Sequence, residues 1–273
     1  MGARRVARFR VFAFLILAAA LSLARPAPVP AAAAVPIDLV GHKAVYELAL
    51  DRARGDVTAA SGTMSYEVVD ACDGWAVHQR LMMTLTNRDG QDIDMLSEYT
   101  TWESKDGKTL RFRMRQTTEQ AVTSDVAGEA ELDPTTGGIA RYTTPDGQTK
   151  ELGKGTLFPM AHTEAIIRAA MAGKKFVALP LFDGTGAEGA QDSTVAVANW
   201  GGPEPGKWPA LAGLPSGRVH VAFFDQSAGT QQPDYEVSMR YWANGVADDL
   251  VMDFGEFSMR GKLSTLALQP KGC

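Results

Sequence analysis

The stretch His42–Leu50, HKAVYELAL, decides the fold: every second side chain from His42 belongs to one row, while Lys43 and Glu47 lie in the other. Successive side chains of a β-strand point to opposite faces of a sheet, so this alternation predicts a half-buried strand. Residues 64–68 and 75–85 repeat the period of two, and the polar Gln79 breaks the apolar row of the second stretch. The pattern therefore predicts an antiparallel, strand-rich protein.

Two turn signals predict the pairing of neighbouring strands. Asp106-Gly107 suits a two-residue type I′ turn. Counting outward from it gives the pairs Met114–Tyr99, Phe112–Thr101, Arg115–Glu98, Arg113–Thr100 and Arg111–Trp102. The same counting from Asn244-Gly245 gives Met239–Leu250, Val237–Met252, Tyr235–Phe254 and Arg240–Asp249. Apolar side chains meet on one face of each hairpin, as a shared core requires.

One segment departs from the strand pattern. Residues 159–172 are rich in apolar side chains, with Pro159 in the first turn and Gly173 just past the end, which predicts a helix. Further strands are expected at residues 194–200, 218–224 and 257–268, and the Gly- and Pro-rich residues 201–217 are expected to form a surface loop. We therefore predict a curved antiparallel sheet with a single helix packed on its concave face.

Composition excludes several classes of protein. Of the 273 residues, 45% are hydrophobic and 22% are charged, which excludes an intrinsically disordered chain. Five of the 27 basic residues lie in residues 1–34, which contain no Asp or Glu, so 22 basic residues face 32 acidic ones in residues 35–273, a net charge of −10. Such an acidic chain does not fit nucleic-acid binding, which needs a basic surface.

The first 34 residues resemble a secretory signal peptide. Arginines precede an apolar run from Val11 to Leu23, and Ala32–Ala34 offers a cleavage site. Cleavage after Ala24 and an uncleaved N-terminal anchor are the alternatives. No second long apolar segment follows, so we expect an exported domain at residues 35–273 without a transmembrane segment.

The two cysteines, Cys72 and Cys273, are expected to pair, because disulfides persist in exported proteins and a free thiol there invites intermolecular bridging. The alternative is two free thiols. A bridge would close a loop of about 200 residues, which the chain-entropy treatment values at on the order of 5 kcal/mol at most.

No catalytic or cofactor motif stands out. The chain has no G-x-S-x-G elbow, H-E-x-x-H, P-loop or dinucleotide fingerprint, and none of His42, His78, His162 and His220 has a second ligand at metal spacing. Asp183–Gly186 lacks the oxygen ligands of a calcium loop and predicts a plain turn. We therefore expect no catalytic residue, no metal and no cofactor, and a protein that is not an enzyme.

One basic cluster could bind an anion or an acidic partner. Arg111, Arg113 and Arg115 alternate along an expected strand and should share one face, with Lys108 nearby. The alternative is the solvated face of an edge hairpin, partly paired with Glu98.

Several segments, in order, resemble the EipB-like periplasmic proteins of Gram-negative cell envelopes: HKAVYEL (42–48), CDGW (72–75), LFPMAHT (157–163), LFDG (181–184), NGV (244–246) and Cys273. The resemblance spans essentially all of the chain after residue 34. It implies an antiparallel β-spiral, an open broken barrel wrapped around one central helix, and a disulfide that falls on Cys72 and Cys273. It also implies a periplasmic role in cell-envelope integrity, without a known enzymatic activity.

Three functional hypotheses follow. The first is a non-enzymatic periplasmic protein that supports envelope integrity by binding an envelope protein or another envelope component. The second is a periplasmic carrier or sensor of a lipid or other hydrophobic ligand, which a large apolar cavity beside the helix would favour and a filled interior would exclude. The third is a hydrolase, which requires a histidine that reaches a hydroxyl and a carboxylate inside a pocket.

Overall fold

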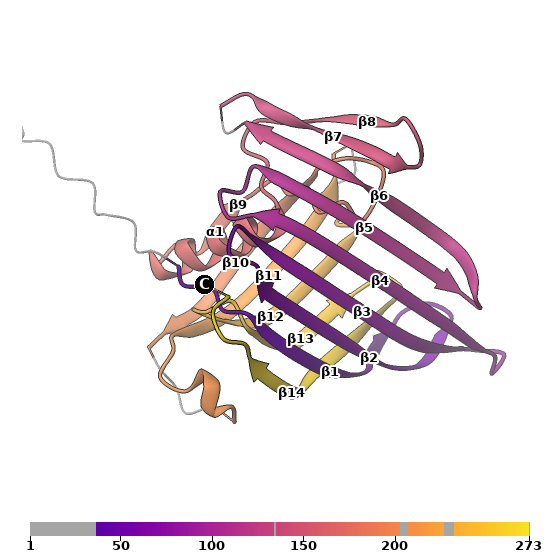
Figure 1. The fold of residues 1–273 in the computed structure, drawn as a ribbon. Coiled ribbons are helices and arrows are strands. Elements are labelled where there is room, and N and C mark those ends of the chain that lie inside the picture. The colour runs from indigo at the N-terminus through magenta and orange to yellow at the C-terminus, as the bar shows by residue number, and fades with distance from the viewer. Residues whose placement is uncertain (1–36, 134, 203–206, 227–231, 273) are drawn as a thin grey trace, which may run out of the picture. The chain divides into compact units, whose positions relative to one another are not determined.

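The computed structural model describes residues 37–272, except 134, 203–206 and 227–231, so the predicted signal peptide lies outside the described residues. Figure 1 labels its elements. The first half contains β1 (His42–Ala53), β2 (Val57–Asp70), β3 (Gly74–Asn87), β4 (Asp92–Ser104), β5 (Thr109–Thr118), β6 (Ala121–Asp133), β7 (Gly137–Thr144) and β8 (Thr149–Leu152). The second half contains α1 (Pro159–Met171), β9 (Phe176–Ala178), β10 (Gln191–Gly201), the 3-10 helix η1 (Pro209–Leu211), β11 (Ser216–Asp225), β12 (Tyr235–Trp242), β13 (Ala247–Asp253) and β14 (Phe257–Leu268).

All the strands belong to a 14-stranded antiparallel sheet, ordered β8-β7-β6-β5-β4-β3-β2-β1-β14-β13-β12-β11-β10-β9. The first strand therefore pairs with the last, and β8 and β9 form the two ends. These two end strands are not paired with each other in the described part of the chain, so the sheet is open. The predicted open antiparallel fold around one helix is confirmed.

The two halves of the sheet face each other across a shared interior. In Figure 1, β2–β7 lie in front of β10–β13, and a single apolar cluster joins side chains of β1–β3 to those of β12–β14. Tyr46 crosses this interior, and its hydroxyl donates to the Ala247 carbonyl at 2.7 Å. A second cluster, built around Phe112, Phe158 and Phe182, fills the end of the sheet at β5–β8.

The predicted helix is present, with Pro159 in its first turn. Gly173, with a φ of 74°, ends it in the left-handed conformation, and its N–H donates to the Ala170 carbonyl. Ile167 packs with Val68 and Val77 of the first half, whereas Ile166 and Ala170 pack against valines of β10 and β11. The helix therefore lies between the two halves of the sheet.

The register counted from Asp106-Gly107 is confirmed at all five pairs. The type I′ turn is wrong, however, because only Gly107 has a positive φ, and its N–H donates to the Ser104 carbonyl. A type I turn followed by a left-handed glycine therefore connects these strands.

The register counted from Asn244-Gly245 is confirmed at Val237–Met252 but fails nearer the turn, where Arg240 lies opposite Asp248 and not Asp249. The N–H of Trp242 donates to the Val246 carbonyl, so the loop has three residues. Asp249, at a φ of 52°, forms a bulge that restores the register.

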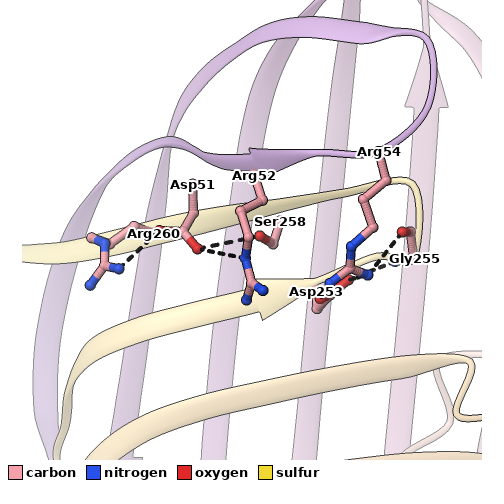
Figure 2. A network of polar contacts seen from close by, with 7 residues as sticks. All are labelled: Asp51, Arg52, Arg54, Asp253, Gly255, Ser258 and Arg260. Atoms are coloured by element: carbon pink, nitrogen blue, oxygen red, sulfur yellow. Dashed lines mark hydrogen bonds and ion pairs between the residues drawn. The ribbon is translucent and has the colours of Figure 1, made fainter.

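Polar contacts hold β1 to the last two strands on one surface, as Figure 2 shows. Arg260 donates to Asp51 at 2.9 Å, and Arg54 donates to Asp253 at 2.9 Å. Arg52 also lies 3.4 Å from Asp51. Such half-exposed pairs contribute little individually, but the group fastens the seam between the beginning and the end of the sheet.

Candidate functional site

Two adjoining hollows lie inside the sheet. The first has a volume of about 240 Å³ and is bordered by Met160 and Thr163 of α1. The second has a volume of about 500 Å³ and lies between β3–β5 on one side and β11–β14 on the other. Gln79, Tyr235 and Met252 line both hollows, so we treat them as one interior cavity.

The lining of the interior cavity is mainly apolar and rich in methionine. Methionine side chains are flexible and polarizable, which suits a surface that must adapt to its occupant. The methionines that line it are Met64, Met83, Met95, Met114, Met160, Met239 and Met252. Alternation along the strands places six of these side chains on the inward face, and Met160 belongs to α1.

Polar groups form the smaller part of the lining of the interior cavity. Gln79 stands where the two hollows meet, and it is the residue that interrupts the apolar row of β3 in the sequence. The hydroxyls of Thr163 and Tyr241 lie 3.5 Å apart beside the helix. Gln79 can therefore orient the polar end of a bound molecule, while most of the wall contacts apolar groups.

Two ionisable residues other than tyrosine line the cavity. Burial lowers the pKa of His42, whose Nδ1 lies 2.9 Å from the Val40 carbonyl, so the ring is neutral at neutral pH. Burial raises the pKa of Asp183, although hydrogen bonds from Thr185 act in the opposite direction. The cavity therefore offers neither a cationic side chain nor a paired set of carboxylates.

His162 is committed to a structural contact. Its Nε2 lies 2.8 Å from the Ser193 hydroxyl, and that hydroxyl donates to the Leu179 carbonyl at 2.5 Å. Because the serine proton is directed at the carbonyl, the imidazole donates to the serine oxygen and does not activate it. Burial lowers the pKa of His162 to about 4, which keeps the ring neutral.

His220 has the partners of a hydrolytic site but not the surroundings. Its Nδ1 lies 2.8 Å from the Ser238 hydroxyl, and its Nε2 lies 2.8 Å from Glu236. Val219 and Val221 on either side of it point toward α1, so His220 points to the opposite, outer face. These half-exposed residues line neither interior hollow. The hydrolase hypothesis requires the three groups to lie inside a pocket, and neither hollow provides one for His220.

A buried glutamate holds the start of the helix, and the sequence analysis missed it. Both oxygens of Glu103 accept backbone hydrogen bonds, from Met160 at 2.7 Å and from Ala161 at 2.8 Å. Burial raises the pKa of Glu103 to about 7, although these two bonds act to lower it. The register could have located this residue, because Glu103 follows Tyr99 and Thr101 on the inward face of β4.

The basic stripe, Arg111, Arg113 and Arg115, lies on one exposed face of β5, as the alternation predicted. The interpretation as an edge hairpin is wrong, because β4 and β5 lie between β3 and β6. Arg113 pairs with Asp125 at 3.0 Å, and Arg111 lies over the Trp102 ring. Anion binding by the stripe stays a prediction.

The other predicted contacts of this basic cluster are local. Arg115 lies opposite Glu98 as counted, but the ion pair of Glu98 is with Arg80, at 2.7 Å. Lys108 is 3.3 Å from Asp106 in the same turn. Carboxylates therefore border the cluster on the neighbouring strands.

The predicted disulfide involves Cys273, which lies outside the described residues. Cys72 lies in the turn between β2 and β3, with a φ of 68°. Gly272 lies against this turn, because a Cβ built on Gly272 would overlap the Asp70 carbonyl. The end of the described chain is therefore close to the Cys72 turn, and the disulfide itself stays a prediction.

The described residues contain neither a candidate metal site nor a candidate membrane-spanning helix. No group of three or more His, Cys, Asp or Glu among them is arranged to hold a metal ion. Within the same residues, no helix has the length and apolar character needed to cross a membrane.

An open antiparallel sheet around one helix defines a class of β-rich, barrel-like proteins. The chain belongs to the EipB-like family, whose model matches residues 32–270. This confirms the resemblance found in the sequence.

Known proteins of Brucella abortus are similar to this chain. The cell envelope integrity protein EipB of Brucella abortus (strain 2308) is 32% identical over 248 residues, and the match covers 88% of each chain. A crystal structure of a beta-barrel-like protein of a domain of unknown function from Brucella abortus matches with a TM-score of 0.79 and 31% identity. That match covers 86% of this chain and 100% of the other.

Proposed function

We propose that this chain supports the integrity of a cell envelope without catalysing a reaction, by binding the apolar part of an envelope component in its interior cavity. The envelope role is supported by the name of the Brucella relative, a cell envelope integrity protein. The observation that carries the binding role is the pair of adjoining, mainly apolar hollows, of which the smaller borders α1. A protein partner is the other form of the hypothesis, and no described feature favours it to the same degree.

The dimensions of the interior cavity suit a hydrocarbon chain. Its two parts, of about 240 and 500 Å³, together fall within the range of small-molecule sites, which is roughly 300 to 1,000 Å³. Each methylene moved from water into such a lining stabilises the complex by about 0.8 kcal/mol. Gln79, at the junction of the two parts, is placed to bind a polar group of the ligand.

The test uses cis-parinaric acid, a fluorescent fatty acid, as the probe. We expect the wild-type protein to bind it and Ser97→Phe to weaken binding at least tenfold, because Ser97 lines the larger hollow and a benzyl group there occupies the space. Thr100→Phe is the matched control, since Thr100 is an exposed residue of the same strand, and it should bind like the wild type.

Two outcomes would overturn the binding role. The first is that the wild-type protein does not bind the probe and its organic extract contains no lipid, which would mean that the interior cavity does not hold an apolar ligand. Equal weakening by Ser97→Phe and Thr100→Phe, with circular dichroism unchanged, would place the probe outside the interior.

We further propose that residues 1–34 are a signal peptide, that residues 35–273 form one exported domain in the periplasm, and that Cys72 pairs with Cys273. The basic and apolar pattern of the first 34 residues supports export. The packing of Gly272 against Asp70, two residues before Cys72, supports the bridge.

A further inference from the structure

An apolar side chain at the end of the sheet is exposed beside two lysines. Residues 171–176 are exposed without interruption, from the end of α1 to the start of β9. Phe176 is 74% exposed, the highest value among the large hydrophobic side chains of the described residues. We name Met171, Lys174, Lys175 and Phe176 the tip patch.

The backbone fixes the direction of Phe176. Val177 packs into the cluster of α1 with β10 and β11, so its neighbour Phe176 must point to the other face of the strand. The Lys175 carbonyl accepts the N–H of Val197 at 2.8 Å, which joins the tip patch to the sheet. This backbone hydrogen bond anchors the tip patch to β10.

The charge of the segment that carries the tip patch is opposite to that of the chain. No Asp or Glu occurs between Glu164 and Asp183, although residues 35–273 carry a net charge of −10. Neither Lys174 nor Lys175 forms an ion pair with a carboxylate in the part of the chain that the structure describes. Arg168 on the last turn of α1 lies 3.7 Å from Glu164.

We propose that the tip patch docks this protein onto the surface of an anionic lipid membrane. Phe176 and Met171 supply apolar groups that enter the interface, and the lysines attract the anionic headgroups. An anionic surface repels the rest of this acidic chain, so the charge distribution also orients the molecule with the tip patch toward the membrane.

Docking at the tip patch has a consequence that rests on the proposed function. Met171 also lines an outer hollow of about 400 Å³, together with Val40 and Asn244. These last two residues line the interior cavity as well, so the outer hollow lies next to it. Docking would place the outer hollow next to the lipid surface from which a ligand could enter.

The test is sedimentation with vesicles of equal parts phosphatidylglycerol and phosphatidylcholine at low salt. We expect the wild type to bind, and the paired substitution Lys174→Glu and Lys175→Glu to weaken binding by at least roughly 25-fold, since each lysine strengthens binding about fivefold. Phe176→Ser should weaken binding roughly tenfold. Lys154→Glu, which reverses another exposed lysine, and Val122→Ser, at a position 49% exposed on β6, are the controls and should bind like the wild type.

Binding that disappears in vesicles of phosphatidylcholine alone and in high salt would support the proposal. Wild-type protein that does not sediment with the anionic vesicles would overturn it, and so would equal binding by all variants and controls. Ser97→Phe is expected to dock normally, so loss of the cavity function and loss of docking are distinguishable.

Discussion

Glu103 gives the sharpest prediction about stability. The residue is 2% exposed, and its carboxyl group holds the first turn of α1 through two backbone hydrogen bonds. Burial raises its pKa from 4.5 to about 7. The perturbation is Glu103→Gln, which keeps the shape of the side chain and removes its titration.

The magnitude follows from linkage between protonation and folding. The pKa of Glu103 is higher in the folded protein than in the unfolded chain, so the native protein binds the proton more tightly. Its contribution to stability is fully present below pH 4.5 and is lost as the pH rises through 7. At 1.36 kcal/mol per pKa unit, the shift corresponds to about 3 kcal/mol.

The assay is urea unfolding of both proteins at pH 4.5 and pH 8. We compare the free energy of unfolding of the wild type with that of Glu103→Gln. The wild-type value minus the variant value should be about 3 kcal/mol lower at pH 8 than at pH 4.5. Glu151→Gln, which removes an exposed carboxyl group on β8, is the control and should keep the wild-type pH dependence. A difference in free energy of unfolding between the wild type and Glu103→Gln that stays constant or rises between pH 4.5 and pH 8 would refute the reasoning. In that case the two N–H donors and the helix dipole keep the Glu103 carboxylate ionised.

Three further predictions concern the rest of the chain. Cys273→Ser should lower the melting temperature under oxidising conditions and leave the reduced protein little changed; equal melting of both oxidised proteins would rule out a stabilising bridge to Cys72. The anion-binding hypothesis for the basic stripe predicts that changing its three arginines to glutamine weakens binding to lipopolysaccharide at least roughly tenfold at low salt. Unchanged binding would mean that the stripe is a solvated face of the sheet without a role in anion binding. Gly184→Ala should destabilise the protein by about 2 kcal/mol or more in urea unfolding, because Gly184 has a positive φ and a Cβ there would overlap the Phe112 ring. Gly153→Ala, where a Cβ meets nothing, is its control, and equal stability of the two variants would contradict the packing argument.

The strands and the helix could be predicted because each depends on a local pattern. The Asp106-Gly107 hairpin has the counted register because its alternation is unbroken on both sides. The Asn244-Gly245 hairpin does not, because a three-residue loop and the bulge at Asp249 each add a residue that no hydrophobic period reveals.

The interior cavity could not be located from the sequence. Its volume depends on how far side chains of β3–β5 and β11–β14 reach across the space between them, and this distance follows from the curvature of the whole sheet. Gln79 was the one local signal, a polar residue in an inward apolar row. Phe176 was missed because a three-residue strand is too short to carry a period.

The pairing of β1 with β14 has a consequence for how the chain folds. Residues His42 and Leu268 are register partners, so the middle of the sheet is made by segments from opposite ends of the sequence. All other neighbouring strands of the described sheet are consecutive in the sequence, so this pairing has to close by far the largest loop before its contacts form, and we expect it to form slowly. A polypeptide still lacking its last strand cannot complete this seam, so during synthesis it stays incompletely folded until the last strand is available.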